Sequence, residues 1–268
     1  MSSKRSGGAI ALPRELWRRR ELALILVQRN LKIRYKSSVL GFFWTLLGPL
    51  LLILIYALFL GVLRVPIELP VLVTGIVAWQ FLAMCLGDSL HAVVGNANLV
   101  TKAAFPRILL PLSMMKANLV NFLLSLLVVA GYLLCVRVSF GPVLLCVPAL
   151  VTHAALCFGV ALLFSCANVF FRDTEHILSV VMLAWFFMSP VIYPIETLLG
   201  NPDFPAWVHM LYFCNPMAGI VTTYRMALLS HPSPGLDLLL LSYAGAWAVA
   251  AVGVMVFQHW EPYFGDEL

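Results

Sequence analysis

The residues with the clearest capacity for chemistry are cations gathered at the start of the chain. Ten of the 17 lysines and arginines lie in the first 36 residues, and an apolar run then continues from Lys36 to Leu63. Such cations bind anionic lipid headgroups or an acidic partner surface. A basic cluster directly beside a long apolar segment also indicates a membrane boundary and its cytoplasmic side.

The other reactive side chains form no catalytic or metal-binding pattern. The six cysteines include no CxxC pair and most lie in apolar runs, so we expect them to be small core residues. The six histidines show no HExxH or similar spacing, so we predict no metal site. The sequence has no Ser-His-Asp pattern, no paired carboxylates and no GxxxxGK[ST] phosphate loop. We therefore expect a chain that is not an enzyme and binds no cofactor itself.

The composition makes lipid the main solvent of this protein. Of its 268 residues, 62% are hydrophobic and 11% are charged, and the mean hydropathy is +0.96. Soluble domains carry about 25% charged residues. One aqueous core cannot bury so much apolar surface, so we predict an all-α membrane protein. In that setting the basic start of the chain favours an anionic membrane surface, and we expect no nucleic-acid partner.

Six segments are long and apolar enough to cross a bilayer as helices, which takes about 20 residues each. They are 39–63, 69–93, 108–136, 142–168, 176–193 and 236–257. With Lys116 counted inside, 14 lysines and arginines lie on one side of this topology and three on the other. This asymmetry predicts that both chain ends are cytoplasmic.

The segments outside these spans predict three further elements. Residues 1–36 form a cytoplasmic tail and, from 14 on, an amphipathic interface helix with Leu24 and Val27 opposite Arg29 and Lys36. Residues 258–268 form a cytoplasmic tail. Residues 194–232 are rich in proline and in aromatic side chains, so we expect short re-entrant helices between spans five and six. Irregular backbone at membrane depth must be buried in protein or line a cavity.

Several blocks of the sequence resemble the ABC-2 type permeases that export polysaccharides, including O-antigen, capsule and teichoic-acid permeases. The blocks are RNLKIRYKSSVLGFFWTLLGPLL at 29–51, NLVTKAAFPRILLPLS at 98–113, FFRDTEHIL at 170–178, FFMSPVIYP at 186–194, NPMAGIVTTYRMALL at 215–229 and EPYFGDEL at 261–268. They follow the family's order and spacing over nearly the whole chain.

The resemblance implies a permease subunit of the bacterial inner membrane, in a six-span domain covering 37–257. It implies a homodimer with one channel between its protomers, and two copies of a separate ATP-binding subunit that carries ATP and Mg²⁺. The substrate would be a glycan linked to undecaprenyl diphosphate, with O antigen for lipopolysaccharide the first expectation.

The resemblance also implies four groups of site residues. An entrance for the diphosphate would use Arg29, Arg34 and Lys36, since arginine can bind phosphate oxygens in a bidentate manner. Aromatic walls of the channel would use Tyr56, Phe59, Trp185 and Phe187. A coupling helix at about 96–107 would touch the ATPase through Asn98, Lys102, Phe105 and Arg107. An outer gate at about 194–232 would use Pro194, Trp207, Asn215, Pro216 and Arg225.

Other functions fit the residues less well. An ABC-2 permease for capsule, teichoic acid, a small lipid or a drug is the nearest alternative, but the LGxxW and SPVIYP blocks favour a glycan. A membrane glycosyltransferase or acyltransferase needs a polar catalytic cluster at one membrane face, and the sequence shows none. A secondary carrier needs intramembrane charges as its relay, and the span centres are almost uncharged.

Overall fold

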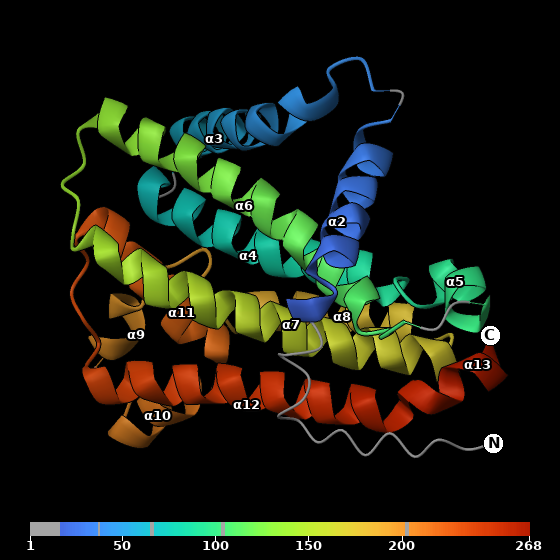
Figure 1. Ribbon diagram of the computed structural model, residues 1–268. Coiled ribbons are helices and arrows are strands. Elements are labelled where there is room, and N and C mark those ends of the chain that lie inside the picture. The colour runs from blue at the N-terminus through green and yellow to red at the C-terminus, as the bar shows by residue number, and fades with distance from the viewer. Residues whose placement is uncertain (1–16, 37, 65–66, 103–104, 202–203) are drawn as a thin grey trace.

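The computed structural model describes residues 17–36, 38–64, 67–102, 105–201 and 204–268, and every regular element within these ranges is a helix (Figure 1). The α-helices are α2 (Arg20–Tyr35), α3 (Trp44–Leu63), α4 (Leu69–Leu90), α5 (Ala97–Lys102), α6 (Leu109–Val136), α7 (Cys146–Phe170), α8 (Thr174–Phe187), α9 (Glu196–Leu199), α10 (Ala206–Phe213), α11 (Pro216–Leu229), α12 (Leu236–Trp260) and α13 (Phe264–Glu267). Four short 3₁₀ turns join them, η1 (Gly41–Phe43), η2 (Val94–Asn96), η3 (Val143–Leu145) and η4 (Glu261–Tyr263).

Within the described residues, five helices are long and apolar enough to cross a membrane: α3, α4, α6, α7 and α12. They coincide with five of the six predicted spans. The remaining prediction, 176–193, corresponds to α8, which has only 14 residues and ends at Phe187. Pro190 accounts for this early end, because it lacks an N–H and disfavours helical backbone at the residue before it.

The tightest contact between spans is that of α7 with α12, which lie side by side along their length (Figure 1). The two backbones meet at Gly159 and Gly253, where a Cβ on Gly253 would lie 2.3 Å from the Gly159 carbonyl oxygen. Small residues allow such close approach of helices in lipid. Of the five long helices, α4 is the most deeply buried and α3 the most exposed.

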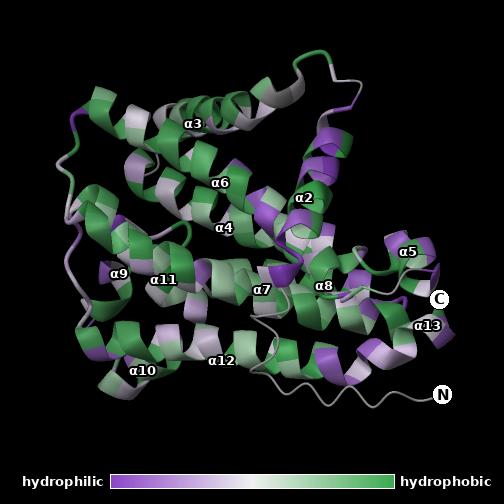
Figure 2. Ribbon diagram, viewed as in Figure 1, coloured by the Kyte–Doolittle hydropathy of each residue, from purple (hydrophilic) through white to green (hydrophobic). Residues whose placement is uncertain are grey.

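The polar parts of the chain gather at one end of the bundle. Helices α5 and α13 and the carboxyl terminus lie at that end, on the right in Figure 1, and α9 and α10 lie at the other. In Figure 2, hydrophilic residues concentrate on α2, α5 and α13, whereas the middles of the long helices are hydrophobic. This distribution matches a protein whose apolar belt is solvated by lipid.

Helix α2 packs on α6 with part of its predicted apolar side and with polar side chains. The prediction put Leu24 and Val27 on the apolar side of an interface helix, with Arg29 and Lys36 on the opposite side. In the structure Leu24 is 56% exposed, whereas Arg29 and Arg34 are partly buried against neighbouring elements. Val27 of the apolar side is buried, at 8% exposure, and the burial of the two arginines comes from polar partners on other elements, which a hydropathy pattern does not register. Residues 14–16, where the predicted helix begins, lie outside the described residues.

The proline-rich region divides into an exposed helix and a buried one. On α10, Trp207, Met210 and Leu211 are exposed. On α11, by contrast, residues from Met217 to Arg225 are buried almost without interruption. Much of this region is thus part of the protein interior, as its apolar composition predicts.

Candidate functional site

A polar triad joins α2, α4 and α6. Arg34 forms an ion pair with Asp88 and also donates a hydrogen bond to Asn118 Oδ1 at 2.8 Å. The Asn118 amide donates in turn to Asp88 Oδ2 at 2.7 Å and to the Met84 carbonyl at 3.2 Å. The side chains of Arg34 and Asp88 are 24% and 36% exposed, so water still reaches the pair. Asp88 therefore offsets the positive charge of Arg34 in this structure.

Further hydrogen bonds extend this contact along α2. They are Arg29 Nη2 to Asn96 Oδ1 (2.9 Å), Asn30 Nδ2 to Ser113 Oγ (3.0 Å) and Tyr35 Oη to Asn121 Oδ1 (3.3 Å). We call these bonds and the Arg34 triad the α2 seam. Burial raises the pKa of the Tyr35 phenol, which keeps it a neutral donor.

The predicted entrance residues therefore differ in their surroundings. Arg29 and Arg34 lie in the α2 seam, whereas Lys36 is exposed just beyond the end of α2. The sequence pattern does not single out the amide and hydroxyl partners of this seam. The signal that could have drawn attention to them is the pair Asn118 and Asn121, one helical turn apart inside an otherwise apolar span.

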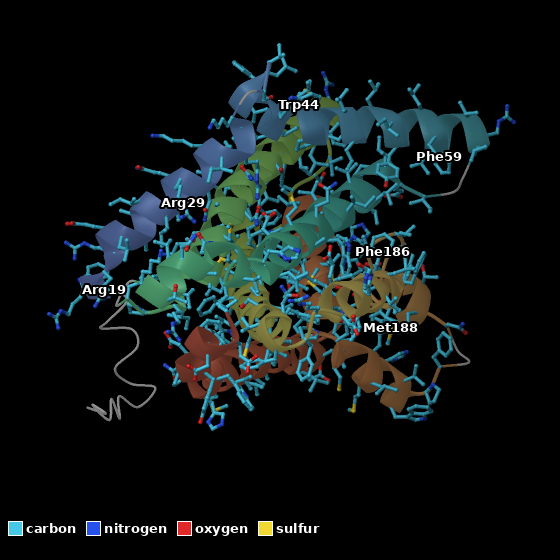
Figure 3. All side chains as sticks on the ribbon, turned by 90° about the vertical axis from the view of Figure 1, so that its right-hand side faces the viewer. Arg19, Arg29, Trp44, Phe59, Phe186 and Met188 are labelled. Atoms are coloured by element: carbon cyan, nitrogen blue, oxygen red, sulfur yellow. The ribbon has the colours of Figure 1, made fainter. Side chains whose placement is uncertain are left out.

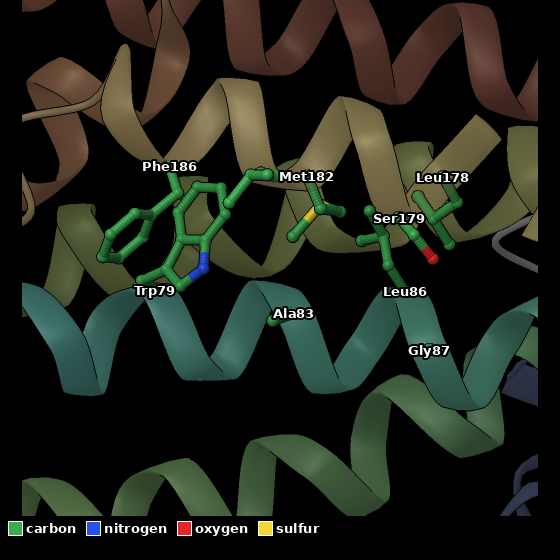
Figure 4. Close-up of a pocket in the computed structure, with 9 residues that line it drawn as sticks. Trp79, Ala83, Leu86, Gly87, Leu178, Ser179, Met182 and Phe186 are labelled. Atoms are coloured by element: carbon green, nitrogen blue, oxygen red, sulfur yellow. The ribbon is translucent and has the colours of Figure 1, made fainter. Parts of the chain in front are cut away.

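An open apolar pocket of about 410 Å³ lies between α4 and α8 (Figure 4). Its walls are Trp79, Ala83, Leu86, Gly87, Leu178, Ser179, Met182, Leu183 and Phe186. The Trp79 ring meets Phe186 edge-to-face at 5.4 Å and Trp185 at 6.1 Å between centroids. The only hydroxyl in the wall, that of Ser179, donates to the Glu175 carbonyl at 2.9 Å, so the pocket offers mainly apolar contact.

The four aromatic residues predicted to line a channel fall into two groups. Trp185 is half-buried and its indole N–H donates to Asn215 Oδ1 at 2.7 Å, while Tyr56 packs against the main core. Phe59 and Phe187 are instead 51% and 61% exposed. In Figure 3, Trp44 marks the start of α3 and Phe59 lies one turn before its end, while Phe186 and Met188 lie where α8 ends. Among the described residues, no ring contact joins Tyr56 or Phe59 of α3 to the predicted channel aromatics of α8.

A buried arginine holds together the opposite end of the bundle. Arg225 on α11 is 1% exposed and donates to the carbonyls of Val71 (3.0 Å), Val191 (2.8 Å) and Tyr193 (2.8 Å). A Cβ on Gly75 would lie 2.2 Å from the Val191 carbonyl oxygen, so this packing requires glycine.

Asn215 joins the end of α8 to the start of α11. Its Oδ1 accepts from the Met217 N–H at 3.0 Å and from Trp185, which makes it the N-cap of α11. Its amide donates to the Met188 carbonyl at 3.0 Å and to Ser189 Oγ at 2.9 Å. Two of the predicted gate residues, Asn215 and Arg225, thus hydrogen-bond to the segment that follows α8, in which Pro194 is half-buried. Pro216 is the first residue of α11. The exposed Trp207 lies outside this network.

The four predicted coupling residues also separate. Asn98 and Lys102 are exposed on α5. Phe105 packs against the core, and Arg107 hydrogen-bonds to Glu261 of the carboxyl-terminal segment. Among the described residues, no three His, Cys, Asp or Glu side chains gather so that they could hold a metal ion.

Comparison with known proteins gives a consistent result over most of the chain. A family model described as ABC-2 type transporter matches residues 21–229. The O-antigen export system permease protein RfbA of Myxococcus xanthus is 36% identical over 254 residues, which cover 92% of each chain. Two proteins of the same name from Klebsiella pneumoniae are each 28% identical, over 92% of this chain and 95% of theirs. The apolar helices and these matches show that this multi-pass membrane protein belongs to the ABC-2 type transporter family.

Proposed function

We propose that this protein is the permease subunit of an ATP-driven exporter that moves lipid-linked O antigen across the bacterial inner membrane. The observation that carries the proposal is the 36% identity to an O-antigen export permease over 92% of both chains. The similarity extends over 254 residues, so it concerns most of the chain and not one local motif.

The proposed topology has both chain ends in the cytoplasm. Helices α5 and α13 lie at the same end of the bundle (Figure 1), which supports one side for both, and the excess of lysine and arginine predicted for that side favours the cytoplasm. In this proposal α8 and the turns after it make the fifth crossing, and α9, α10 and α11 re-enter the outer leaflet. The support for re-entry is the burial of α11 together with the exposed apolar surface of α10.

The proposed exporter is a homodimer with two ATP-binding subunits, which carry the ATP and Mg²⁺. A channel between the protomers would be lined by the exposed faces of α3 and α8, including Phe59 and Phe187. Aromatic faces make apolar contact with sugar rings. Each such contact must stay weak, because a polymer held tightly at any step could not slide.

The proposed entrance lies where α2 meets the inner end of the bundle. Lys36 is free to attract a diphosphate, and Arg29 and Arg34 would bind it at closer range. Because Arg34 is paired with Asp88, the headgroup has to displace that carboxylate. Binding of the lipid headgroup and release of α2 from α4 would then be one event.

Deletion of the gene in its own bacterium tests the proposed function. We expect long-chain O antigen to vanish from the cell surface and the lipid-linked glycan to accumulate inside, with recovery on re-expression of the wild-type chain. Electrophoretic ladders of lipopolysaccharide and antibody labelling of intact cells measure both effects. An unchanged ladder with loss of a capsule or another surface glycan would refute the proposed substrate. Normal export by both Arg34→Ala and Lys36→Ala, at unchanged protein level, would refute the entrance alone.

A further inference from the structure

The carboxyl-terminal segment, residues 261–268, packs against the end of the bundle. The Trp260 ring meets Phe170 of α7 edge-to-face at 5.2 Å. Phe264 is fully buried, with ring centroids 5.2 Å from Phe257 of α12 and 5.9 Å from Phe170. Residues 261–268 are therefore attached to the ends of both α7 and α12, and their position is fixed by aromatic packing.

One arginine connects this segment to α5. The backbone N–H of Arg107 donates to Glu261 Oε1 at 2.7 Å, and its guanidinium donates to the Glu261 backbone carbonyl. The same guanidinium donates to the Val100 carbonyl of α5 at 3.3 Å. Arg107 thus bridges the carboxyl-terminal segment and α5, although these elements are about 160 residues apart in sequence.

Helix α5 depends on such contacts for its position. It has only six residues, and so short a helix does not hold its structure in isolation. Its one buried side chain is Val100, at 2% exposure. The contacts that place it come from η2 on one side and from α13 on the other.

We infer that Glu261, acting through Arg107, positions α5 and connects it mechanically to α7 and α12. Since α7 and α12 pack through Gly159 and Gly253, a displacement of α5 moves these two spans as one body. That this connection transmits motion from the ATP-binding subunit to the spans rests on the proposed function, in which that subunit contacts α5. The positioning itself is a property of the permease alone.

The positioning is tested by hydrogen exchange in the full-length permease held in lipid nanodiscs. We compare the wild type with Glu261→Ala, which removes the acceptor of the Arg107 N–H, and Glu261→Gln, whose amide oxygen can replace it. Glu267→Ala is the matched control, because Glu267 is an exposed carboxylate of the same segment. We expect amide exchange over 97–102 to rise about tenfold in Glu261→Ala, the factor that loss of a partly buried charge-assisted hydrogen bond predicts. Exchange in Glu261→Gln and Glu267→Ala should stay within about threefold of the wild type.

Equal exchange over 97–102 in all four proteins would overturn the inference. An equal rise of exchange over 97–102 in Glu261→Ala and Glu261→Gln would also overturn it, because the neutral acceptor would then not restore the position of α5. A general rise over every helix would indicate misfolding. Arg107→Lys then provides the second test, because it keeps the backbone N–H and the charge, and we expect it to loosen 97–102 alone.

A second measurement separates this inference from the proposed function. In the complex with its ATP-binding subunit, we expect Glu261→Ala to hydrolyse ATP at a near-normal rate but to export at least threefold less glycan per ATP. If exchange over 97–102 rises in Glu261→Ala but the glycan exported per ATP does not change, the positioning is upheld and the proposed coupling through α5 is refuted. Unchanged exchange with intact export would refute the positioning and leave the exporter function standing.

Discussion

At the scale of single residues, the cation most important to the proposed entrance already has a carboxylate partner. Arg34 and Asp88 are each partly exposed, and an ion pair in that setting contributes only about 0–1 kcal/mol. A diphosphate offers several charge-assisted hydrogen bonds, which are roughly twice as strong as neutral ones. The pair is thus suited to exchange with a headgroup, and Asn118 can hold Asp88 when Arg34 leaves it.

This exchange predicts opposite effects for two substitutions in the same pair. Asp88→Asn frees Arg34, so we expect farnesyl diphosphate to bind the purified permease about threefold more tightly. Arg34→Gln removes the ligand of the phosphate, so binding should weaken about tenfold, which is about 1.4 kcal/mol. Calorimetric titration measures both, with the exposed Asp266→Asn as control. Loss of binding in both variants to the same extent would mean that the pair has only a structural role.

Arg225 is a residue of the opposite kind, fully buried and bound only to backbone carbonyls. Arg225→Met removes the donor to the carbonyls of Val71, Val191 and Tyr193. Each buried carbonyl left without a hydrogen bond lowers stability by about 1–3 kcal/mol. We therefore expect a loss of at least about 3 kcal/mol of stability, seen as a clearly lower melting temperature in detergent. The exposed Arg172→Met should melt within experimental error of the wild type. Equal melting temperatures for the two variants would show that the Arg225 contacts do not hold the turn.

At the scale of elements, the α7–α12 contact depends on the absence of side chains. Gly253→Ala places a Cβ 2.3 Å from the Gly159 carbonyl oxygen, so the helices must separate, at a cost of about 1–3 kcal/mol. Gly131→Ala on α6 is the matched control, because a Cβ there meets nothing within 4 Å. We expect thermal unfolding to distinguish the two, with Gly131→Ala unchanged or slightly stabilised. A destabilised Gly131→Ala would show that loss of glycine itself, and not the crossing, is responsible.

The elements also show which features can be predicted from sequence. The five long helices follow from runs of apolar residues, and these are local properties of the chain. The early end of α8 follows from Pro190, a local signal that the count of apolar residues missed. The α2 seam could not be predicted, because Arg34 meets Asp88 and Asn118 across 54 and 84 residues of sequence. Such a pairing depends on the packing of three helices, which the apolar pattern of α2 alone does not determine.

At the scale of the whole molecule, contacts between helices distinguish a closely packed set from two loosely packed helices. Helices α4, α7, α11 and α12 share closely packed contacts, including the Gly159–Gly253 crossing and the carbonyls around Arg225. Helices α3 and α8 instead expose long rows of large apolar side chains. In the proposed exporter these rows face lipid or the partner protomer, and the closely packed set transmits the motion of α5. The sequence predicts the helices of each set, but their unequal packing is a property of the fold.

The proposed orientation of the molecule gives a prediction that involves both ends of the bundle. In a variant without the six native cysteines, Ser139→Cys lies in the loop between α6 and η3, and Asn98→Cys lies on α5; both positions are exposed. With both chain ends in the cytoplasm, a membrane-impermeant maleimide should label Ser139→Cys in spheroplasts and spare Asn98→Cys. Asn98→Cys should react only after the membrane is opened, as judged by a mass shift on a gel. The reverse pattern would invert the orientation, and it would place the cations of α2 and the diphosphate entrance on the wrong face for a substrate made in the cytoplasm.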